Sequence, residues 1–450
     1  MSIAENRWPR ATALQLAAIA FVAMTTSSPR SSSAEPWRLS DRLPEWLTVE
    51  LHNQTRFEAI DEQFRAGLTG GDQVLSTRTG IFAEARGSAW RVGGEVVDMR
   101  AYLSDDNTPV DFAYANPLDI LQAYVAFDAE NEERKLSLLL GRFTLDLGSR
   151  RFIARNRYRN TINAFTGGHL HYEASDTTVD AFATLPVRIR PTDRDAIADN
   201  AFELDTESFD NVFWGVYVRR VFGDVAFEPY VFGRHDRRAN GRADLLNPGV
   251  RVVKNPAVGD VHFELEALLQ VGEVEQLNHL AGFLHASTGY TFDVWAQPSL
   301  SLTFEYASGD EDPDDDVSHG FNHLYGVPRP EYGPTMIYLA FNRTNLFTPG
   351  IQLDASPFDG VRTLITARSF TLAAARDAWF GSGYSDPTGQ SGATLGEQFE
   401  VRVQYDVLPG NVRLEGGFAH LWRRGFAVNA ARGAPTPNPT IGYLQVEMNI

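Results

Sequence analysis

The chain has 450 residues, a formal net charge of -18 and no cysteine. The missing cysteine excludes disulfides and thiolate metal sites, and the acidity argues against nucleic acid as a partner. Hydrophobic residues make up 43% of the sequence, but the mean hydropathy of -0.26 is too polar for a bundle of membrane helices.

Residues 1–34 predict a secretory signal peptide. Arg7 and Arg10 supply a basic start, an apolar run extends from Ala11 to Met24, and Ser32–Ala34 offers small residues for cleavage. The apolar run is too short for an anchoring helix, and no stretch of about 18 apolar residues follows it. We therefore expect an exported protein whose mature region, residues 35–450, forms a single domain without spanning helices.

Charged side chains occupy the polar faces of the first predicted strands. Arg56, Arg78, Arg86 and Arg100 are examples, and Glu84, Glu95 and Asp98 lie among them. Either a soluble surface or a water-filled lumen would accept such residues. If the apolar faces of these strands point toward lipid, the arginines point into the lumen.

The stretch from Gly141 to Asn160 gathers positive charge in an acidic chain. Lys135–Leu145 predicts a strand that includes Arg142, and the residues after it predict a loop or a segment folded back. An arginine facing lipid costs about 2–4 kcal/mol at the midplane of the membrane, so the arginines of this segment must face the lumen or water. They are Arg150, Arg151, Arg155, Arg157 and Arg159.

Rings of arginine in a pore favour anions, and the guanidinium group can bind a carboxylate through two hydrogen bonds. The alternative is a solvated basic loop without a ligand. The candidate pore-lining residues are Arg56, Arg78, Arg86, Arg100, Arg142, Arg150, Arg151, Arg155 and Arg159.

His169 and His171 would share one face of a strand. A metal site needs further ligands, and the sequence does not identify any, so we interpret this pair as ordinary polar residues of a lumen or rim. No cofactor is expected.

Two-residue alternation continues along the chain. Between Val261 and Val271, apolar residues alternate with residues such as His262, Glu264 and Glu266. One face of each such strand is therefore apolar and the other polar. The segments run about 9–11 residues and often end in aromatics, which favours a membrane barrel over a soluble sandwich.

The segment Ser308–Thr335 predicts a long loop, and the cluster Asp310–Asp316 within it is strongly acidic. Clustered carboxylates can bind calcium, but we favour a solvated loop because like charges repel. In contrast, Pro409 and Gly410 predict a tight turn between two strands. Long loops on one rim and short turns on the other are typical of outer-membrane barrels. We expect about 16–18 antiparallel strands.

The order of several sequence pieces resembles the alginate export family of outer-membrane porins. These pieces include RTGIFAEARG at 78–87, LGRFTLDLGSRRFIARNRYRN at 140–160, YASGD at 306–310 and LGEQFEVRVQY at 395–405. The resemblance implies eighteen strands in the outer membrane of a Gram-negative bacterium. It also implies an arginine-lined lumen that passes a polyuronate such as alginate, with Arg142, Arg150 and Arg151 at the family's GR and SRR positions.

Three classes of function remain open. The first is a passive channel for anionic polysaccharide or oligosaccharide, with outer-membrane lipid and a periplasmic export scaffold as candidate partners. The second is a general or small-solute uptake porin in which arginines oppose acids such as Glu84, Glu95 and Asp98. The third is a barrel-embedded hydrolase, but the sequence contains no hydrolase motif such as GxSxG or HExxH, so we expect no enzyme.

Overall fold

The computed structural model describes residues 36–105, 108–238, 241–329, 331–334 and 336–450. The signal peptide expected at residues 1–34 lies outside the described residues.

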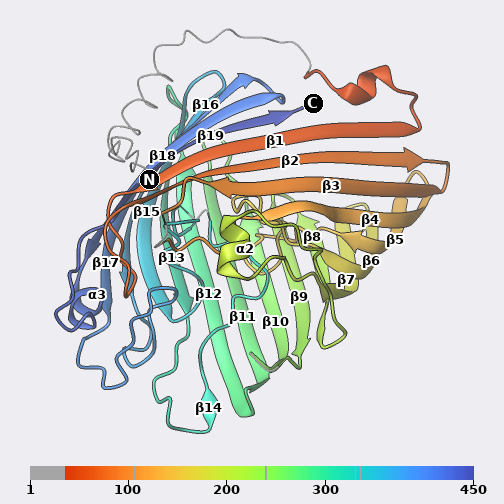
Figure 1. Ribbon diagram of the computed structural model, residues 1–450. Helices are drawn as coiled ribbons and strands as arrows, with labels where there is room; N and C mark the ends of the chain where they lie inside the picture. Colours follow the sequence, from red (N-terminus) through yellow and green to blue (C-terminus); the bar gives the residue numbers. More distant parts are fainter. Residues whose placement is uncertain (1–35, 106–107, 239–240, 330, 335) are drawn as a thin grey trace, which may run out of the picture.

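Eighteen long antiparallel strands form a closed barrel, because β1 pairs with both β2 and β19 (Figure 1). The expected all-β barrel and its eighteen strands are confirmed. Closure leaves no unpaired sheet edge, which a bilayer requires because it cannot hydrogen-bond the backbone.

The first nine strands are β1 (Leu47–Ile60), β2 (Asp72–Arg86), β3 (Trp90–Tyr102), β4 (Asn116–Glu130), β5 (Arg134–Phe143), β6 (Phe165–Ala174), β7 (Thr177–Pro186), β8 (Asn211–Phe222) and β9 (Val225–Asp236). The other nine are β10 (Ala243–Lys254), β11 (Val261–Val274), β12 (Leu277–Thr291), β13 (Ser299–Ala307), β15 (Leu346–Phe358), β16 (Val361–Thr371), β17 (Thr394–Leu408), β18 (Val412–Arg423) and β19 (Thr440–Asn449).

The remaining elements are short. The two-residue strand β14 (Val317–Ser318) pairs in parallel with β12 and is not part of the count of eighteen. The helical pieces are η1 (Leu39–Arg42), α2 (Arg194–Ala198) and α3 (Gly425–Asn429). In the described part of the chain, no helix has the length and apolarity to cross a membrane.

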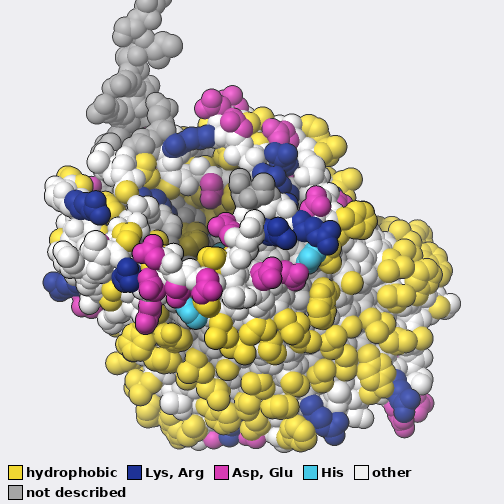
Figure 2. Space-filling model, turned by 90° about the horizontal axis from the view of Figure 1, so that it is seen from below, with side chains coloured by type: hydrophobic (Ala, Val, Ile, Leu, Met, Phe, Trp, Pro, Cys, Tyr) yellow, Lys and Arg dark blue, Asp and Glu magenta, His cyan; other side chains and the backbone are white. Residues whose placement is uncertain are grey.

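The alternation in the sequence defines the two faces of the wall. In β11, Val261, Leu265 and Leu269 are exposed on the outside, whereas His262 and Glu266 are buried on the inner face. Repeated around the barrel, this pattern gives a broad belt of hydrophobic side chains, and charged side chains gather around a hollow at one end (Figure 2). The outer surface therefore suits lipid.

The two rims differ as expected. Turns at residues 175–176, 223–224 and 409–411 are short and lie on the rim where β1 begins. The opposite rim has the long connections, including residues 187–210 and 372–393, although residues 275–276 form a tight turn there as well. These lengths match an outer-membrane barrel, whose long loops face outward.

Two of the long connections fold into the barrel. We call residues 144–164, between β5 and β6, the first inner loop. The second inner loop is formed by residues 319–329, 331–334 and 336–345, between β14 and β15. The two loops pair through a bridge between Ile153 and Tyr325. Phe152 of the first inner loop packs edge-on against Phe283 of β12 and contacts Phe321 of the second. Part of the lumen is therefore a packed core.

The exposure of the outer face leads to a prediction about stability. Leu302 in β13 is 60% exposed on the outside, so Leu302→Arg should lower the free energy of unfolding by about 2–4 kcal/mol, the cost of arginine in hydrocarbon. Urea unfolding of the barrel from lipid vesicles measures this. Val294→Arg is the control, because Val294 is equally exposed but lies in a short connection at the rim, and its cost should be about 0–1 kcal/mol. Equal effects would contradict the placement of the belt.

Candidate functional site

The first inner loop crosses the lumen, and one end of it is held by arginines of β1 and β2. Arg78 donates through Nη1 to the carbonyl oxygens of Arg159 at 2.8 Å and Asn160 at 3.2 Å. Arg56 donates through Nη1 to the carbonyl oxygen of Tyr158 at 2.8 Å. Both arginines are buried, and their Nη1 groups hold the backbone of the first inner loop.

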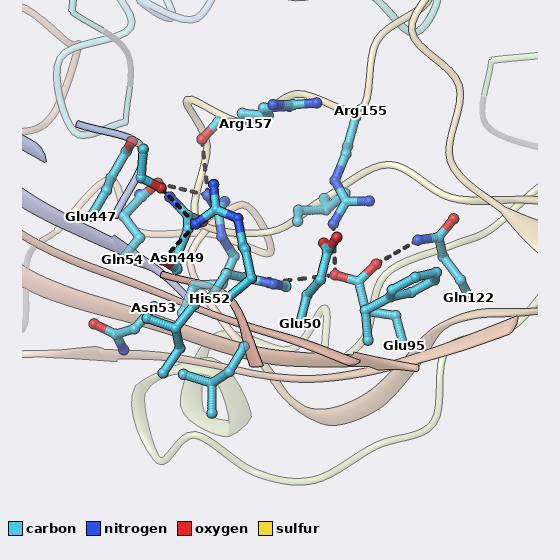
Figure 3. A pocket seen from close by; sticks show the side chains of 17 residues that line it. Glu50, His52, Asn53, Gln54, Glu95, Gln122, Arg155, Arg157, Glu447 and Asn449 are labelled. Atoms are coloured by element: carbon cyan, nitrogen blue, oxygen red, sulfur yellow. Dashed lines mark hydrogen bonds and ion pairs between the residues drawn. The ribbon is translucent and has the colours of Figure 1, made fainter. Parts of the chain in front are cut away.

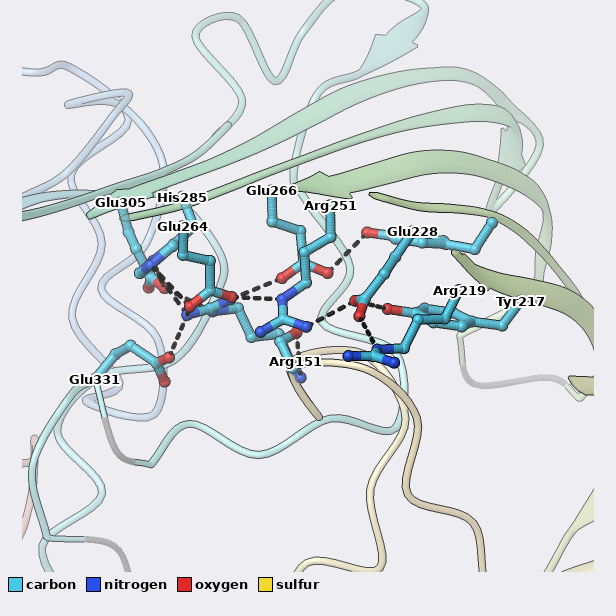
Figure 4. Close-up of polar contacts among 12 residues, drawn as sticks. Arg151, Tyr217, Arg219, Glu228, Arg251, Glu264, Glu266, His285, Glu305 and Glu331 are labelled. Carbon is cyan, nitrogen blue, oxygen red and sulfur yellow. Dashed lines mark hydrogen bonds and ion pairs between the residues drawn. The ribbon is translucent and has the colours of Figure 1, made fainter. Parts of the chain in front are cut away.

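The other end of the loop is held by Arg151, which is 4% exposed and meets four carboxylates (Figure 4). Its guanidinium contacts Glu264 and lies 2.8 Å from Glu266, both on β11. It also lies 3.3 Å from Glu305 of β13 and 2.8 Å from Glu331 of the second inner loop. Burial alone would lower the pKa of Arg151, but the charges of Glu331, Glu264 and Glu266 raise it well above its usual value.

Two further arginines and a histidine complete this cluster. Arg343 of the second inner loop lies 2.6 Å from Glu331, and Nδ1 of His285 lies 2.8 Å from Glu305. Arg251 of β10 reaches Glu264 at 2.7 Å. Because a buried charge is stable only when it is paired, the cluster ties both inner loops to the wall.

A cavity of about 500 Å³ lies beside the first inner loop, against the inner faces of β1 to β3 (Figure 3). Arg155 projects into it and lies 2.6 Å from Glu95 of β3. Arg157 also lines it, with 68% of its side chain exposed and its nearest carboxylate, Asp146, 3.7 Å away. This cavity therefore presents both a paired and an accessible guanidinium.

A second cavity, of about 270 Å³, contacts residues 146–148 of the same loop. The strands contribute Asp180, Glu228 and Arg251 to its lining. The two cavities share no lining residue, so the first inner loop stands between them.

The nine candidate arginines occupy five kinds of place, of which the outer face is described in the next paragraph. Arg56 and Arg78 face inward and hold the loop, whereas Arg86 is exposed at the short-turn rim, where it donates to Thr48 at 2.9 Å. Arg151 and Arg155 are ion-paired inside the barrel. The loop also contains two half-buried arginines, Arg150 and Arg159; burial lowers the pKa of Arg159 to about 10, and Asp111 opposes that shift.

Arg100 and Arg142 lie on the outer face, which differs from the expected lumen position. Arg100 has the same parity in β3 as the exposed Val92 and Val96, and it pairs with Asp98 at 2.9 Å. Asp98 therefore cannot oppose arginines across the lumen.

Arg142 follows the exposed Leu136, Leu138 and Leu140 in β5 at the same two-residue spacing. It binds Glu207 of the 187–210 connection at 2.8 Å. Both outward arginines lie near the long-loop ends of their strands and pair with acids, which removes the need to place a bare charge in lipid.

Several lumen arginines were not among the candidates. Arg251, Arg368 and Arg402 lie on inner faces of strands, and the polar side of the alternation could have identified them. Arg329 and Arg343 belong to the second inner loop, whose sequence has no periodicity. Only the fold shows that this loop turns inward.

Comparisons with known proteins agree with this architecture. A family model described as alginate export matches residues 45–436. No curated protein matches the sequence.

Several solved outer-membrane structures are similar to the barrel. The outer membrane protein opdK from Pseudomonas aeruginosa has a TM-score of 0.57 at 12% identity, over 89% of this chain and 98% of that chain. OccK9 (OpdG) from the same organism has a TM-score of 0.61 at 12% identity, over 90% and 98%. OccAB4 from Acinetobacter baumannii has a TM-score of 0.58 at 11% identity, over 89% and 98%. At these identities the likeness shows the fold alone.

The cluster around Arg151 predicts that its removal releases the first inner loop. Arg151→Met leaves buried carboxylates without their cation, so the free energy of unfolding should fall by about 3–5 kcal/mol. Limited proteolysis should then cut within residues 144–164. Arg157→Met is the matched control, because it removes an exposed arginine of the same loop and should change stability by less than about 1 kcal/mol. Equal protection of the loop in both variants would contradict the anchoring role.

Proposed function

The chain belongs to the alginate export family, and on that premise we propose that its lumen passes anionic saccharides, alginate or a related polyuronate, as a passive channel. The barrel is an outer-membrane channel of a Gram-negative bacterium. The proposal concerns the solute and the residues that select it.

The exposed guanidinium of Arg157 in the 500 Å³ cavity is the observation that carries the proposal. A uronate has one carboxylate on each sugar, and the guanidinium fork can bind a carboxylate through two hydrogen bonds. Since Arg157 is 68% exposed and 3.7 Å from Asp146, its donors are accessible to a passing carboxylate. Arg155 stands beside it in the same cavity.

The neighbouring polar residues suit a sugar as well. Gln54 and Gln122 line the same cavity, and amide groups can donate to and accept from sugar hydroxyls. The acids Glu50 and Glu447 also line it, so the positive field is local to the inner loop. We therefore assign selection to contact with the loop arginines rather than to the charge of the whole lumen.

A second candidate, a small-solute uptake porin with an eyelet of arginines and acids, rests on a different contact. Arg155 is paired with Glu95 at 2.6 Å, which joins the inner loop to the wall by opposite charges. Such a pair favours a transverse field and reduces net anion preference. Opposite-charge pairs of this kind fit uptake of small polar solutes as well as passage of a saccharide.

The two candidates predict different selectivity. In planar bilayers under a salt gradient, the wild-type channel should show a reversal potential that favours anions, and oligomannuronate should block the current while neutral maltose oligomers do not. Arg157→Glu should abolish both the anion preference and the block, because it replaces the accessible donor with a like charge. An unselective channel that no uronate blocks would contradict the saccharide proposal and favour the porin.

Arg424→Glu provides the matched control. Arg424 is 61% exposed and pairs with Glu397 at 3.0 Å, but it follows β18 at the long-loop rim. The charge change equals that of Arg157→Glu, so any effect of net charge alone would appear in both variants. We expect the reversal potential of Arg424→Glu to stay close to that of the wild type.

A further inference from the structure

Three potential metal ligands meet on the inner face of β6 and β7. His169 and His171 lie two residues apart on β6, and Asp180 lies opposite His171 on β7. Nε2 of His169 is 2.9 Å, and Nδ1 of His171 is 2.8 Å, from the same oxygen of Asp180. The three ligand atoms all lie within 4.8 Å of one another.

The triad is accessible from water but is held in place on one side. The side chains of His169, His171 and Asp180 are 18%, 37% and 13% exposed, and Asp180 lines the 270 Å³ cavity. On the other side, the buried ring of Phe143 stacks on His169 with 5.9 Å between ring centroids. An ion could therefore enter from the cavity and meet a preformed set of ligands.

We propose that His169, His171 and Asp180 bind a divalent transition-metal ion of the Zn²⁺ class. Imidazole nitrogen and carboxylate oxygen are ordinary zinc ligands, at about 2.0–2.2 Å from the ion. Each histidine binds as the neutral ring, with its proton on the nitrogen that does not bind the metal. Three protein ligands leave a fourth position open toward the cavity, for water or for a carboxylate of a solute.

The other convergent group among the described residues is a weaker candidate. His285, Glu305 and Glu331 also come together, but Arg151 and Arg343 already lie against these carboxylates. A metal ion there would have to displace buried cations. Near the β6–β7 triad, Arg219 and Arg251 instead pair with Glu228, at 3.1 Å and 2.7 Å, which leaves Asp180 to the two histidines.

Calorimetric titration of the full refolded barrel in detergent with ZnCl₂ tests this site without relying on any channel activity. The wild type should bind one ion that His171→Ala and Asp180→Asn each weaken roughly tenfold or more. His52→Ala is the matched control, because His52 faces the other cavity, where it lies 3.4 Å from Glu95, and the variant should bind zinc as the wild type does.

Two further measurements identify the ligands and test whether the heat of zinc binding comes from this site. Electron paramagnetic resonance of bound Cu²⁺ should show coupling to two nitrogens that the double variant His169→Ala/His171→Ala loses. Asp314→Asn/Asp316→Asn, in the exposed acidic loop, should leave the zinc affinity unchanged. Absence of binding by the wild type, full retention in the double histidine variant, or loss in the acidic-loop variant would each overturn the proposal.

Discussion

The pairing of Arg151 with four carboxylates is the interaction on which the interior of this barrel depends. The acids come from β11, β13 and the second inner loop, so one guanidinium joins three separate parts of the chain. Buried charges without partners are strongly unfavourable, and the cluster is satisfied only when both inner loops are in place. The position of the two inner loops in the lumen therefore follows from charge neutralisation more than from the shape of the wall.

The need to pair buried charges divides the arginines into two groups with different roles. Arg56 and Arg78 donate to backbone carbonyls of the first inner loop, and Arg151 pairs with carboxylates. These three arginines therefore position the loop. Arg157 projects from the loop that they hold, with most of its surface free. A group that is already held in place loses less conformational entropy on binding a ligand than a flexible group does. The excess of arginine in this segment thus reflects support of the loop, and under the proposed function it also provides the accessible guanidinium of Arg157.

Two-residue alternation predicted an apolar and a polar face for each strand, because successive side chains of a strand point to opposite sides. The length of the segments and their terminal aromatics then favoured a barrel over a sandwich. Counted from the exposed Leu136 in steps of two residues, the alternation also places Arg142 on the outer face. The outward direction of Arg142 could therefore have been predicted from the sequence. The inward turn of the second inner loop could not be predicted from the sequence, since a loop has no period and its burial depends on distant carboxylates. Asp180 as the partner of His169 and His171 emerged only from the register of β6 with β7.

The seam between β1 and β19 joins the two ends of the described sheet, from His52 opposite Asn449 to Ile60 opposite Ile441. Because these residues are far apart in sequence, their pairing closes the longest loop of the described sheet and carries a loop-closure cost in entropy. A slip of one residue in any hairpin would exchange the lipid and lumen faces of a strand and misalign the seam. The barrel therefore closes through the β1–β19 pairing only when the preceding strands have paired in register.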